Sequence, residues 1–212
     1  MPKTVLLWRV ALIVAVVAWV GWGIPQAVAQ PARVPQTGQT ECWDAVGNPI
    51  NCAGTGQDGD IQAGVVFPAQ RFRDNGNGTV RDNLTGLIWL QDASCDTLGP
   101  NGNGTGTWQQ ALDAANTLAS GNCSLTDRSA AGDWRLPNVN ELHSLLDVGN
   151  YNPAFPSGHP FSGVLTAFFW SSSSHVGFPF LTWTVDLEAG WTLAVIKDSP
   201  NSARIWPVRG GD

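Results

Sequence analysis

The first apolar segment of the chain is short and lies near the N-terminus. A nearly unbroken apolar run at residues 10–20 follows two basic residues, Lys3 and Arg9, and is followed by Ala27-Val28-Ala29. A basic start, a short apolar core and an A-x-A sequence are typical of a secretory signal peptide. The apolar stretch is short for a membrane span of about 20 residues. We therefore predict a signal peptide at residues 1–29, rather than an uncleaved anchor, and no stable membrane insertion after cleavage.

The next part of the chain has no sustained apolar periodicity. Residues 30–66 are rich in Gly, Pro and Gln and contain Cys42 and Cys52. This composition predicts a linker followed by a small Cys-containing extension. From residue 67 onward, periodic segments alternate with Gly/Asn-rich loops. We expect residues 67–212 to form one domain.

Several segments of this domain have strand-like patterns. Residues 71–90 read as paired strands, because Asn75-Gly76 supplies the positive φ angles that tight hairpins need. In the stretch 181–187, Leu181, Trp183, Val185 and Leu187 share one face, which is expected to be buried. The remaining strands are predicted at 167–172, 191–196 and 203–209.

Two helices are predicted between these strand regions. Thr107 and Gln110 have the spacing of a capping box, and Gly121 marks the end of that helix. Asn138 and Glu141 cap a second helix in the same way. The expected buried faces are Trp108, Leu112, Ala115 and Ala119 in the first helix and Leu142, Leu145 and Leu146 in the second, with His143 facing outward. Two helices and antiparallel strands predict an α+β fold.

Composition narrows the possible classes of protein. Charged residues make up 13% of the 212 residues, which argues against a coiled coil or a helical bundle. The net charge of −6 becomes −8 when Lys3 and Arg9 are removed, leaving 9 basic against 17 acidic residues. This acidic balance argues against nucleic acid as a partner. The chain is rich in Trp, with 11 copies, of which three lie in the predicted signal peptide.

The four cysteines all follow the predicted cleavage site. An even number of Cys in an exported chain predicts two disulfides, and four Cys allow three connectivities. We favour Cys42–Cys52 and Cys95–Cys123, because each bond closes a Gly-rich segment without a core of its own. A zinc site is the rival interpretation, but no C-x-x-C spacing occurs and no His lies near a Cys in the sequence.

One motif invites a functional interpretation. The segment Asp133-Trp134-Arg135-Leu136-Pro137 precedes the second helix, so Arg135 could act as a ligand clamp. The alternative is structural: Trp134 fills the core and Arg135 pairs with Glu141 or Asp133. We favour the structural interpretation, since a half-buried Arg usually needs a carboxylate.

Metal and catalytic patterns are weak. The loop at residues 74–78 resembles a calcium loop, but its alternate positions are Gly76 and Gly78, so a plain hairpin turn is expected. Ser171 to Ser174 precede His175, but the chain has no G-x-S-x-G elbow. We predict no enzymatic activity, no metal and no cofactor.

The most specific patterns together resemble a known family. The chain is similar to the Lcl C-terminal domain family, long regarded as a domain of unknown function. The D-W-R-L-P-x-x-x-E-L segment and the hairpin segment are the most characteristic. The matching segments are RFRDNGNGTVRDNLTGLIW (71–89), TWQQALDAANTL (107–118), GDWRLPNVNEL (132–142), FFWSSSS (168–174), TWTVDLEAGW (182–191) and ARIWPVRGG (203–211).

The resemblance implies a C-type-lectin-like fold, in which two helices pack on a twisted, loop-rich, disulfide-linked antiparallel sheet. The founding member of the family is a surface adhesin thought to bind sulfated glycans. This chain has no collagen-like repeats and its domain is acidic, which weakens the transfer of that ligand. Trp206-Pro207 stands where many members have a Cys. Formylglycine-generating enzymes share the fold, but they use a reactive Cys pair near the C-terminus, and no Cys follows Cys123 here.

These observations predict an exported, non-enzymatic, lectin-like adhesion module. Its ligand would be a glycan or a cell-surface protein, and its location the periplasm, the cell surface or the exterior. The candidate ligand-binding residues are Trp170, Trp191, Arg204 and Trp206. One alternative is a structural component of an envelope or appendage assembly. Another is an enzyme of the formylglycine-generating type.

Overall fold

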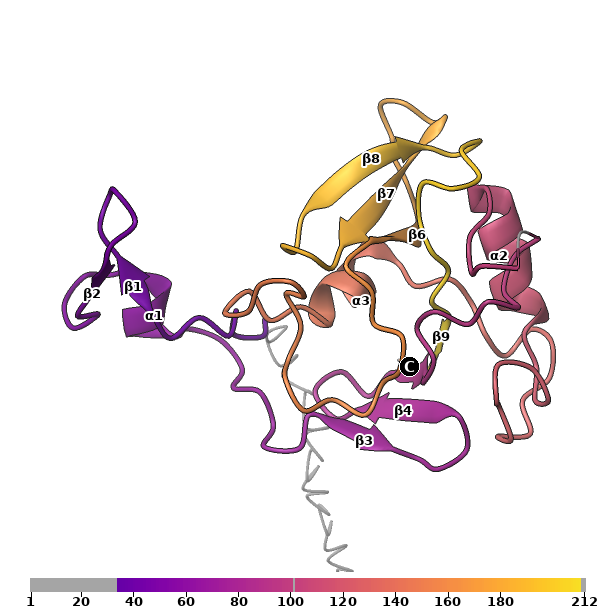
Figure 1. The fold of residues 1–212 in the computed structure, drawn as a ribbon, viewed down its shortest axis with the longest axis horizontal. Coiled ribbons are helices and arrows are strands. Elements are labelled where there is room, and N and C mark those ends of the chain that lie inside the picture. The colour runs from indigo at the N-terminus through magenta and orange to yellow at the C-terminus, as the bar shows by residue number, and fades with distance from the viewer. Residues whose placement is uncertain (1–33, 101, 211–212) are drawn as a thin grey trace, which may run out of the picture. The chain divides into compact units, whose positions relative to one another are not determined.

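The computed structural model describes residues 34–100 and 102–210 of the chain. The predicted signal peptide at residues 1–29 lies outside the described residues. The described part is an α+β protein with antiparallel sheets and few helices, as predicted (Figure 1). Its strands form a two-stranded, a four-stranded and a three-stranded sheet.

The four-stranded sheet has the order β3-β4-β5-β9. The predicted hairpin is confirmed: the Asn75 amide donates to the Thr79 carbonyl at 3.0 Å, and Gly76 and Gly78 have φ angles of 70° and 81°. A side chain at Gly78 would also collide with the backbone of Ser124. The strands are β3 (Phe72–Asp74), β4 (Thr79–Asp82), β5 (Ile88–Leu90) and β9 (Val208–Arg209).

The prediction of one continuous strand at 203–209 is wrong. Arg204 pairs with Phe169 of the other sheet, whereas Val208 pairs with Trp89 in β5. The chain therefore crosses from one sheet to the other at Trp206-Pro207. Proline has no amide to donate, so it suits such a crossing better than a position within a ladder.

The three-stranded sheet has the order β6-β7-β8 and agrees with three predicted strands. Phe169 pairs with Val185, and Thr184 pairs with Leu193 on the next strand. An irregularity between Trp170 and Ser174 shifts the register of the first pair. The strands are β6 (Phe168–Ser174), β7 (Leu181–Asp186) and β8 (Thr192–Ile196).

Helix α2 (Trp108–Thr117) begins with the predicted capping box between Thr107 and Gln110. It ends at Thr117 and not at Gly121. The buried face is also rotated from the predicted one: Ala111, Ala115 and Leu118 are buried, whereas Trp108, Leu112 and Ala119 are only partly so. The Trp108 indole donates to the Ser171 carbonyl at 2.8 Å, and this bond holds the ring beside β6 rather than in the core.

Helix α3 (Val139–Ser144) begins with the predicted capping box between Asn138 and Glu141. It packs against β6 and β7. Its predicted buried face is confirmed at Leu142, Leu145 and Leu146, and the side chain of His143 faces outward as expected.

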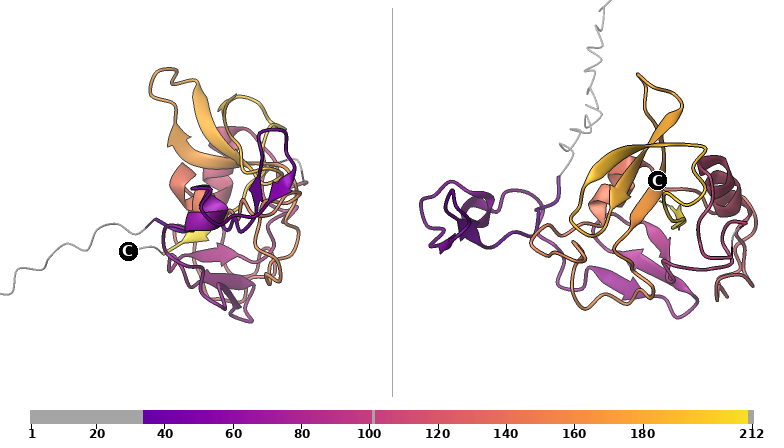
Figure 2. Two further views of the ribbon diagram at one scale, coloured as in Figure 1. Left: turned by 90° about the vertical axis from the view of Figure 1, so that its left-hand side faces the viewer. Right: turned by 45° about the horizontal axis from the view of Figure 1, so that its top comes forward.

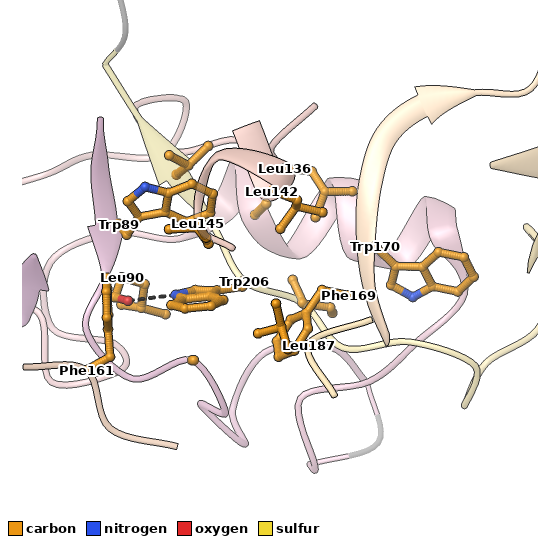
Figure 3. Packing of buried hydrophobic residues seen from close by; sticks show 14 of the residues in the cluster. Trp89, Leu90, Leu136, Leu142, Leu145, Phe161, Phe169, Trp170, Leu187 and Trp206 are labelled. Carbon is orange, nitrogen blue, oxygen red and sulfur yellow. Dashed lines mark hydrogen bonds between the residues drawn. The ribbon is translucent and has the colours of Figure 1, made fainter. Parts of the chain in front are cut away.

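Trp206 lies at the centre of an aromatic core (Figure 3). Its ring centroid lies 5.4 Å from that of Trp89, 5.1 Å from Phe161 and 5.5 Å from Phe169. The Trp206 indole donates to the Leu90 carbonyl at 2.8 Å, so the polar edge of the ring is also satisfied. Trp134 is fully buried too, as predicted. Most of the Trp rings must be buried, because a chain with so few charged residues could not keep that many exposed indoles in solution.

A small unit precedes the main sheets. It contains α1 (Asp58–Ile61) and a short hairpin of β1 (Cys42–Trp43) and β2 (Pro49–Ile50). Both favoured disulfides are present, Cys42–Cys52 here and Cys95–Cys123 in the part of the chain that follows. Two disulfides indicate an oxidising, extracytoplasmic environment. Within the described residues, no helix has the length and apolar character needed to cross a membrane.

Candidate binding surface

The loop between β6 and β7 carries apolar side chains into solvent. Val176, Phe178 and Phe180 are 94%, 55% and 60% exposed. The loop has a defined conformation, because the Phe178 amide donates to His175 Nδ1 at 3.0 Å and the Leu181 amide donates to the Phe178 carbonyl at 2.8 Å. The hairpin projects beyond the rest of its sheet in all views (Figures 1 and 2). Large apolar groups held outward in this way make the hairpin a candidate interaction surface.

Four rings form a continuous line along this hairpin. The ring centroids of Trp183 and His175 are 4.8 Å apart, and those of His175 and Phe178 are 5.3 Å apart. Phe178 and Phe180 continue the line at 6.1 Å. We call Trp183, His175, Phe178 and Phe180 the aromatic ridge. Such ring contacts rigidify exposed side chains, which lowers the entropy that a partner must remove on binding.

The expectation that Trp183 belongs to the core is corrected by this arrangement. Trp183 is only partly buried, whereas Val185 on the same strand and Leu187 just after it are fully buried. The strand runs out of the core toward the hairpin, so the outer part of its predicted apolar face meets His175 instead of core residues.

Two of the four candidate ligand-binding residues lie in the core. Trp170 and Trp206 have no exposed surface. The Trp170 indole donates to the Gly106 carbonyl at 3.1 Å, and Phe169 packs against Trp206. The assignment of these two residues to a ligand-binding surface is therefore wrong. The alternation of residues within the strands did not show that residues 203–206 lie along the edge of β6.

The other two candidates are on the surface but do not form a common site. Trp191 is 68% exposed at the start of β8. Arg204 is partly buried beside β6, and its Nη1 donates to the Asn103 carbonyl at 2.9 Å. Two strands of the sheet separate them. The Arg204 amide donates to the Phe168 carbonyl of β6, and Phe168 pairs with Asp186 of β7. The Asp186 amide in turn donates to the Trp191 carbonyl.

The D-W-R-L-P motif has the structural role that we favoured. Arg135 binds Glu141 through both guanidinium arms, at 2.7 and 2.6 Å. Asp133 accepts from the Ala130 amide at 2.8 Å, and the Pro137 carbonyl accepts from the Ser172 amide at 2.8 Å. The carboxylate of Asp133, the guanidinium of Arg135 and the carbonyl of Pro137 thus hold the chain before and around α3.

The serines before His175 also have structural partners. Ser171 donates to the Trp183 carbonyl at 2.6 Å, Ser173 accepts from the Val139 amide at 3.1 Å, and Ser174 accepts from Lys197 at 2.7 Å. His175 Nδ1 accepts from the Phe178 amide. These bonds hold strand β6 and the loop, and none of them joins a serine hydroxyl to the imidazole.

Helix α3 and the 155–161 segment carry the other two histidines. His143 Nε2 bonds to the hydroxyl of Thr192, and burial lowers the pKa of His143. Burial also lowers the pKa of His159, whose ring meets those of Phe155 at 4.8 Å and Phe161 at 5.9 Å. Apolar neighbours disfavour the imidazolium, so both rings favour the neutral form.

A polar cavity of about 490 Å³ lies between residues 67–74 and 156–160. Arg71 lines it and is buried, with its Nε 3.6 Å from Asp82 and its Nη2 donating to the Ser144 carbonyl. Burial lowers the pKa of Arg71, and Asp82 opposes that shift. Phe67 covers one face of the guanidinium at 4.4 Å. The Asp82 carboxylate and the Ser144 carbonyl compensate part of the charge, whereas Nε and Nη1 have no hydrogen-bond partner in the described part of the chain.

The hairpin at 74–78 is a turn that uses its own side chains. Asp74 accepts from the Gly76 amide at 2.7 Å, and Asn77 accepts from the Thr79 hydroxyl at 2.7 Å. No group of three or more His, Cys, Asp or Glu in the described part of the chain is arranged to hold a metal ion.

Comparison with known families agrees with the motifs. The model of the Lcl C-terminal domain matches residues 78–209, more than half of the chain. The protein belongs to the Lcl C-terminal domain family. No curated protein matches the sequence. The matched part of this Lcl C-terminal domain includes α2, α3 and the aromatic ridge, whereas Arg71 and the Cys42–Cys52 unit precede it.

The sequence analysis missed Phe178 and Phe180. The signal was nevertheless present, because H-V-G-F-P-F between two strands is an apolar run interrupted by Gly and Pro. Gly and Pro favour a loop, and apolar residues in a loop have no core to enter. The apolar composition of this loop therefore indicated that the rings of Phe178 and Phe180 are exposed.

Proposed function

We propose that this Lcl C-terminal domain is an exported, non-enzymatic binding module that attaches to a protein on a cell surface through its aromatic ridge. The observation that carries the proposal is the line of rings from Trp183 to Phe180, with Phe178 and Phe180 more than half exposed. Rigid, exposed aromatic residues are the usual anchors of protein interfaces.

The chemistry of the hairpin tip favours a protein over a sugar. Val176, Phe178 and Phe180 have no polar side-chain atoms, and Pro179 between the two rings has no amide hydrogen. A sugar needs hydrogen-bonding groups beside the stacking ring, because its hydroxyls lose water on binding. An apolar pocket on another protein needs only complementary shape.

Export and a lectin-like fold are parts of the same proposal. The two disulfides support a location in the periplasm, on the cell surface or outside the cell. The lectin-like fold is supported by the family match and by two helices that lie with antiparallel strands. The structural partners of Ser171–Ser174 and His175 support a non-enzymatic role.

A glycan remains the second candidate ligand because of Trp191. Its indole is 68% exposed, and the nearby turn carries Glu188, whose carboxylate accepts from the Tyr151 hydroxyl at 3.0 Å. An exposed ring beside a carboxylate and a hydroxyl is an arrangement on which a sugar could stack and form hydrogen bonds. The acidic chain makes a neutral sugar a better match than a sulfated one.

The test uses residues 30–212 produced with both disulfides. Binding to intact cells of the producing organism is measured before and after protease treatment of those cells. We expect protease to abolish binding, and the Phe178→Ser/Phe180→Ser variant to bind at least about tenfold more weakly, since interface aromatic residues contribute the most binding energy. Ile61→Ser, which changes an apolar residue of 62% exposure outside the ridge, is the control.

Two results would contradict the proposal. One is unchanged binding by the Phe178→Ser/Phe180→Ser variant when its thermal unfolding matches that of the unmodified protein. The other is binding on a glycan array, with and without calcium, that Trp191→Ala abolishes and the ridge variant retains. The second result would establish the glycan alternative.

A further inference from the structure

The outer edge of β8 is a strand edge without a partner. The Asp186 amide donates to the Trp191 carbonyl, and the Lys197 amide donates to the Phe180 carbonyl. Hydrogen bonding in antiparallel strands alternates from residue to residue. The backbone groups of Thr192, Ala194 and Ile196 must therefore point away from β7. Within the described residues, no backbone hydrogen bond reaches them from that side.

The other edges of the two larger sheets are paired or charged. The edge of β6 bonds to Arg204 in both directions, at 2.9 and 2.8 Å. The edge of β9 bonds to Arg135 in the same way, since Arg135 and Val208 exchange amide and carbonyl at 3.0 and 2.9 Å. Strand β3 is short and carries two exposed charged residues, Arg73 and Asp74. Proteins use such devices to keep strand edges from pairing with other chains.

Strand β8 has none of these devices. Its sequence T-L-A-V-I contains no charge and no proline, and Leu193 and Ile196 are 51% and 55% exposed. His143 contacts only the side-chain hydroxyl of Thr192, which leaves the backbone of β8 open. Figures 1 and 2 show β8 on the outside of its sheet. An open, apolar and uncharged edge is a template for another strand.

We infer that β8 pairs antiparallel with β8 of a second copy of this chain, about a two-fold axis at Ala194. In this register the outward-pointing backbone amide and carbonyl of Thr192 face those of Ile196 in the second copy. The backbone groups of Ala194 face those of Ala194 in the second copy. Each of these pairs exchanges two hydrogen bonds. The small side chain of Ala194 lets the two strands approach at the axis.

The side chains are complementary in the same register. Leu193 of each copy lies beside Val195 of the other, which forms apolar cross-strand pairs. Lys197 is the only charged residue from 191 to 197, and it falls opposite Trp191 and not opposite a second lysine. The Lys197 ammonium is held within its own chain by the Ser174 hydroxyl at 2.7 Å and lies 3.9 Å from the Trp108 ring centroid. The register therefore avoids facing like charges, which would repel each other. This self-complementarity favours a second copy over an unrelated strand.

The pairing joins two three-stranded sheets into one continuous sheet. Because the strands are antiparallel, the two aromatic ridges lie toward opposite ends of that sheet. The assembly would present two ridges and gain avidity on a surface with many partner molecules. The inference does not depend on what the ridge binds, since β8 edge pairing uses backbone groups of different residues.

The test measures molar mass by light scattering and by sedimentation over a wide range of concentration. We expect residues 30–212 to form a dimer. Ala194→Glu and Ala194→Lys each place two like charges opposite each other at the axis, so each variant alone should raise the dimer dissociation constant by about tenfold or more. A mixture of the two variants should form a mixed dimer, because the facing charges are then opposite. Val176→Glu places the same charge on the distant hairpin and should leave the dimer intact.

The mixed dimer makes the test independent of folding, because a misfolded variant would not be restored by its counterpart. The inference is overturned if the unmodified protein remains a monomer at all concentrations. It is also overturned if Ala194→Glu dimerises as well as the unmodified protein, or if mixing the two variants restores nothing. Loss of cell binding by the ridge variant with an unchanged dimer would support the proposed function separately.

Discussion

Arg135 and Glu141 form a two-armed ion pair that ties three parts of the domain together. Nη1 lies 2.7 Å from Oε2, and Nη2 lies 2.6 Å from Oε1. Oε2 also accepts from the Asn138 amide at 2.7 Å, which completes the capping box of α3. The backbone of Arg135 pairs with Val208, so the same residue also borders β9. In this chain the D-W-R-L-P motif and Glu141 therefore form a structural clasp.

Breaking this clasp should destabilise the domain. Glu141→Gln and Arg135→Gln should each lower the free energy of unfolding by about 1–2 kcal/mol, because each removes a charge-assisted pair and the first also weakens a cap. Urea denaturation of both single variants and the double variant measures the coupling. We expect a coupling of about 0.5–1 kcal/mol, since the Arg135 side chain is 46% exposed. Strictly additive losses would show that the two residues act independently.

Two tryptophans of the C-terminal strands should behave in opposite ways. Trp206→Ala should cost about 3–5 kcal/mol, because it empties the centre of the aromatic core. Trp191→Ala should change stability by about 0.5 kcal/mol or less, since the ring is exposed. Thermal and urea unfolding check both values. A large loss of stability from Trp191→Ala would mean that its ring is buried in solution.

The two disulfides should contribute unequally to the main domain. Cys95–Cys123 spans 28 residues, and the entropy of the closed loop predicts a contribution of about 3.5 kcal/mol. The Cys95→Ala/Cys123→Ala variant should unfold at a correspondingly lower urea concentration. The control is Cys42→Ala/Cys52→Ala, which opens a bond outside the matched segment at 78–209. An equal loss from both variants would show that the extension and the domain unfold as one unit.

Acid should destabilise the protein through the two histidines whose pKa is lowered in the folded state, His143 and His159. Burial lowers the pKa of His159 in the folded state, so the unfolded chain binds a proton at higher pH. The free energy of unfolding is therefore highest above the usual histidine pKa of about 6.5 and falls as the pH drops from there toward the folded pKa. His159→Gln should reduce this fall, and His143 accounts for part of the remainder. The measurement is urea unfolding at a series of pH values, and an unchanged profile in His159→Gln would contradict the assignment.

Local sequence patterns predicted the local structure well. The Thr107 and Asn138 capping boxes, the Asn75-Gly76 hairpin and both disulfides are found as expected. Each of these features depends on residues close in the chain or on a loop closed by a single bond. The prediction of strands was wrong where the partner strand is distant in the sequence. The segment at 203–209 divides between two sheets, and its own alternation of apolar and polar residues does not reveal this division.

The sequence by itself determined the family, the α+β class, the paired cysteines and the need to bury many indoles in a chain with little charge. Only the tertiary structure decided which indoles are buried. Trp206 is in the core because the segment that pairs with β6 carries it against Trp89 and Phe169, and Trp170 is buried where its indole meets Gly106. Phe178 and Phe180 are exposed because their loop extends beyond the sheet. Burying an aromatic ring is favourable both in a protein core and at an interface with a partner. The residues that pack against the ring in the folded chain decide which of the two occurs.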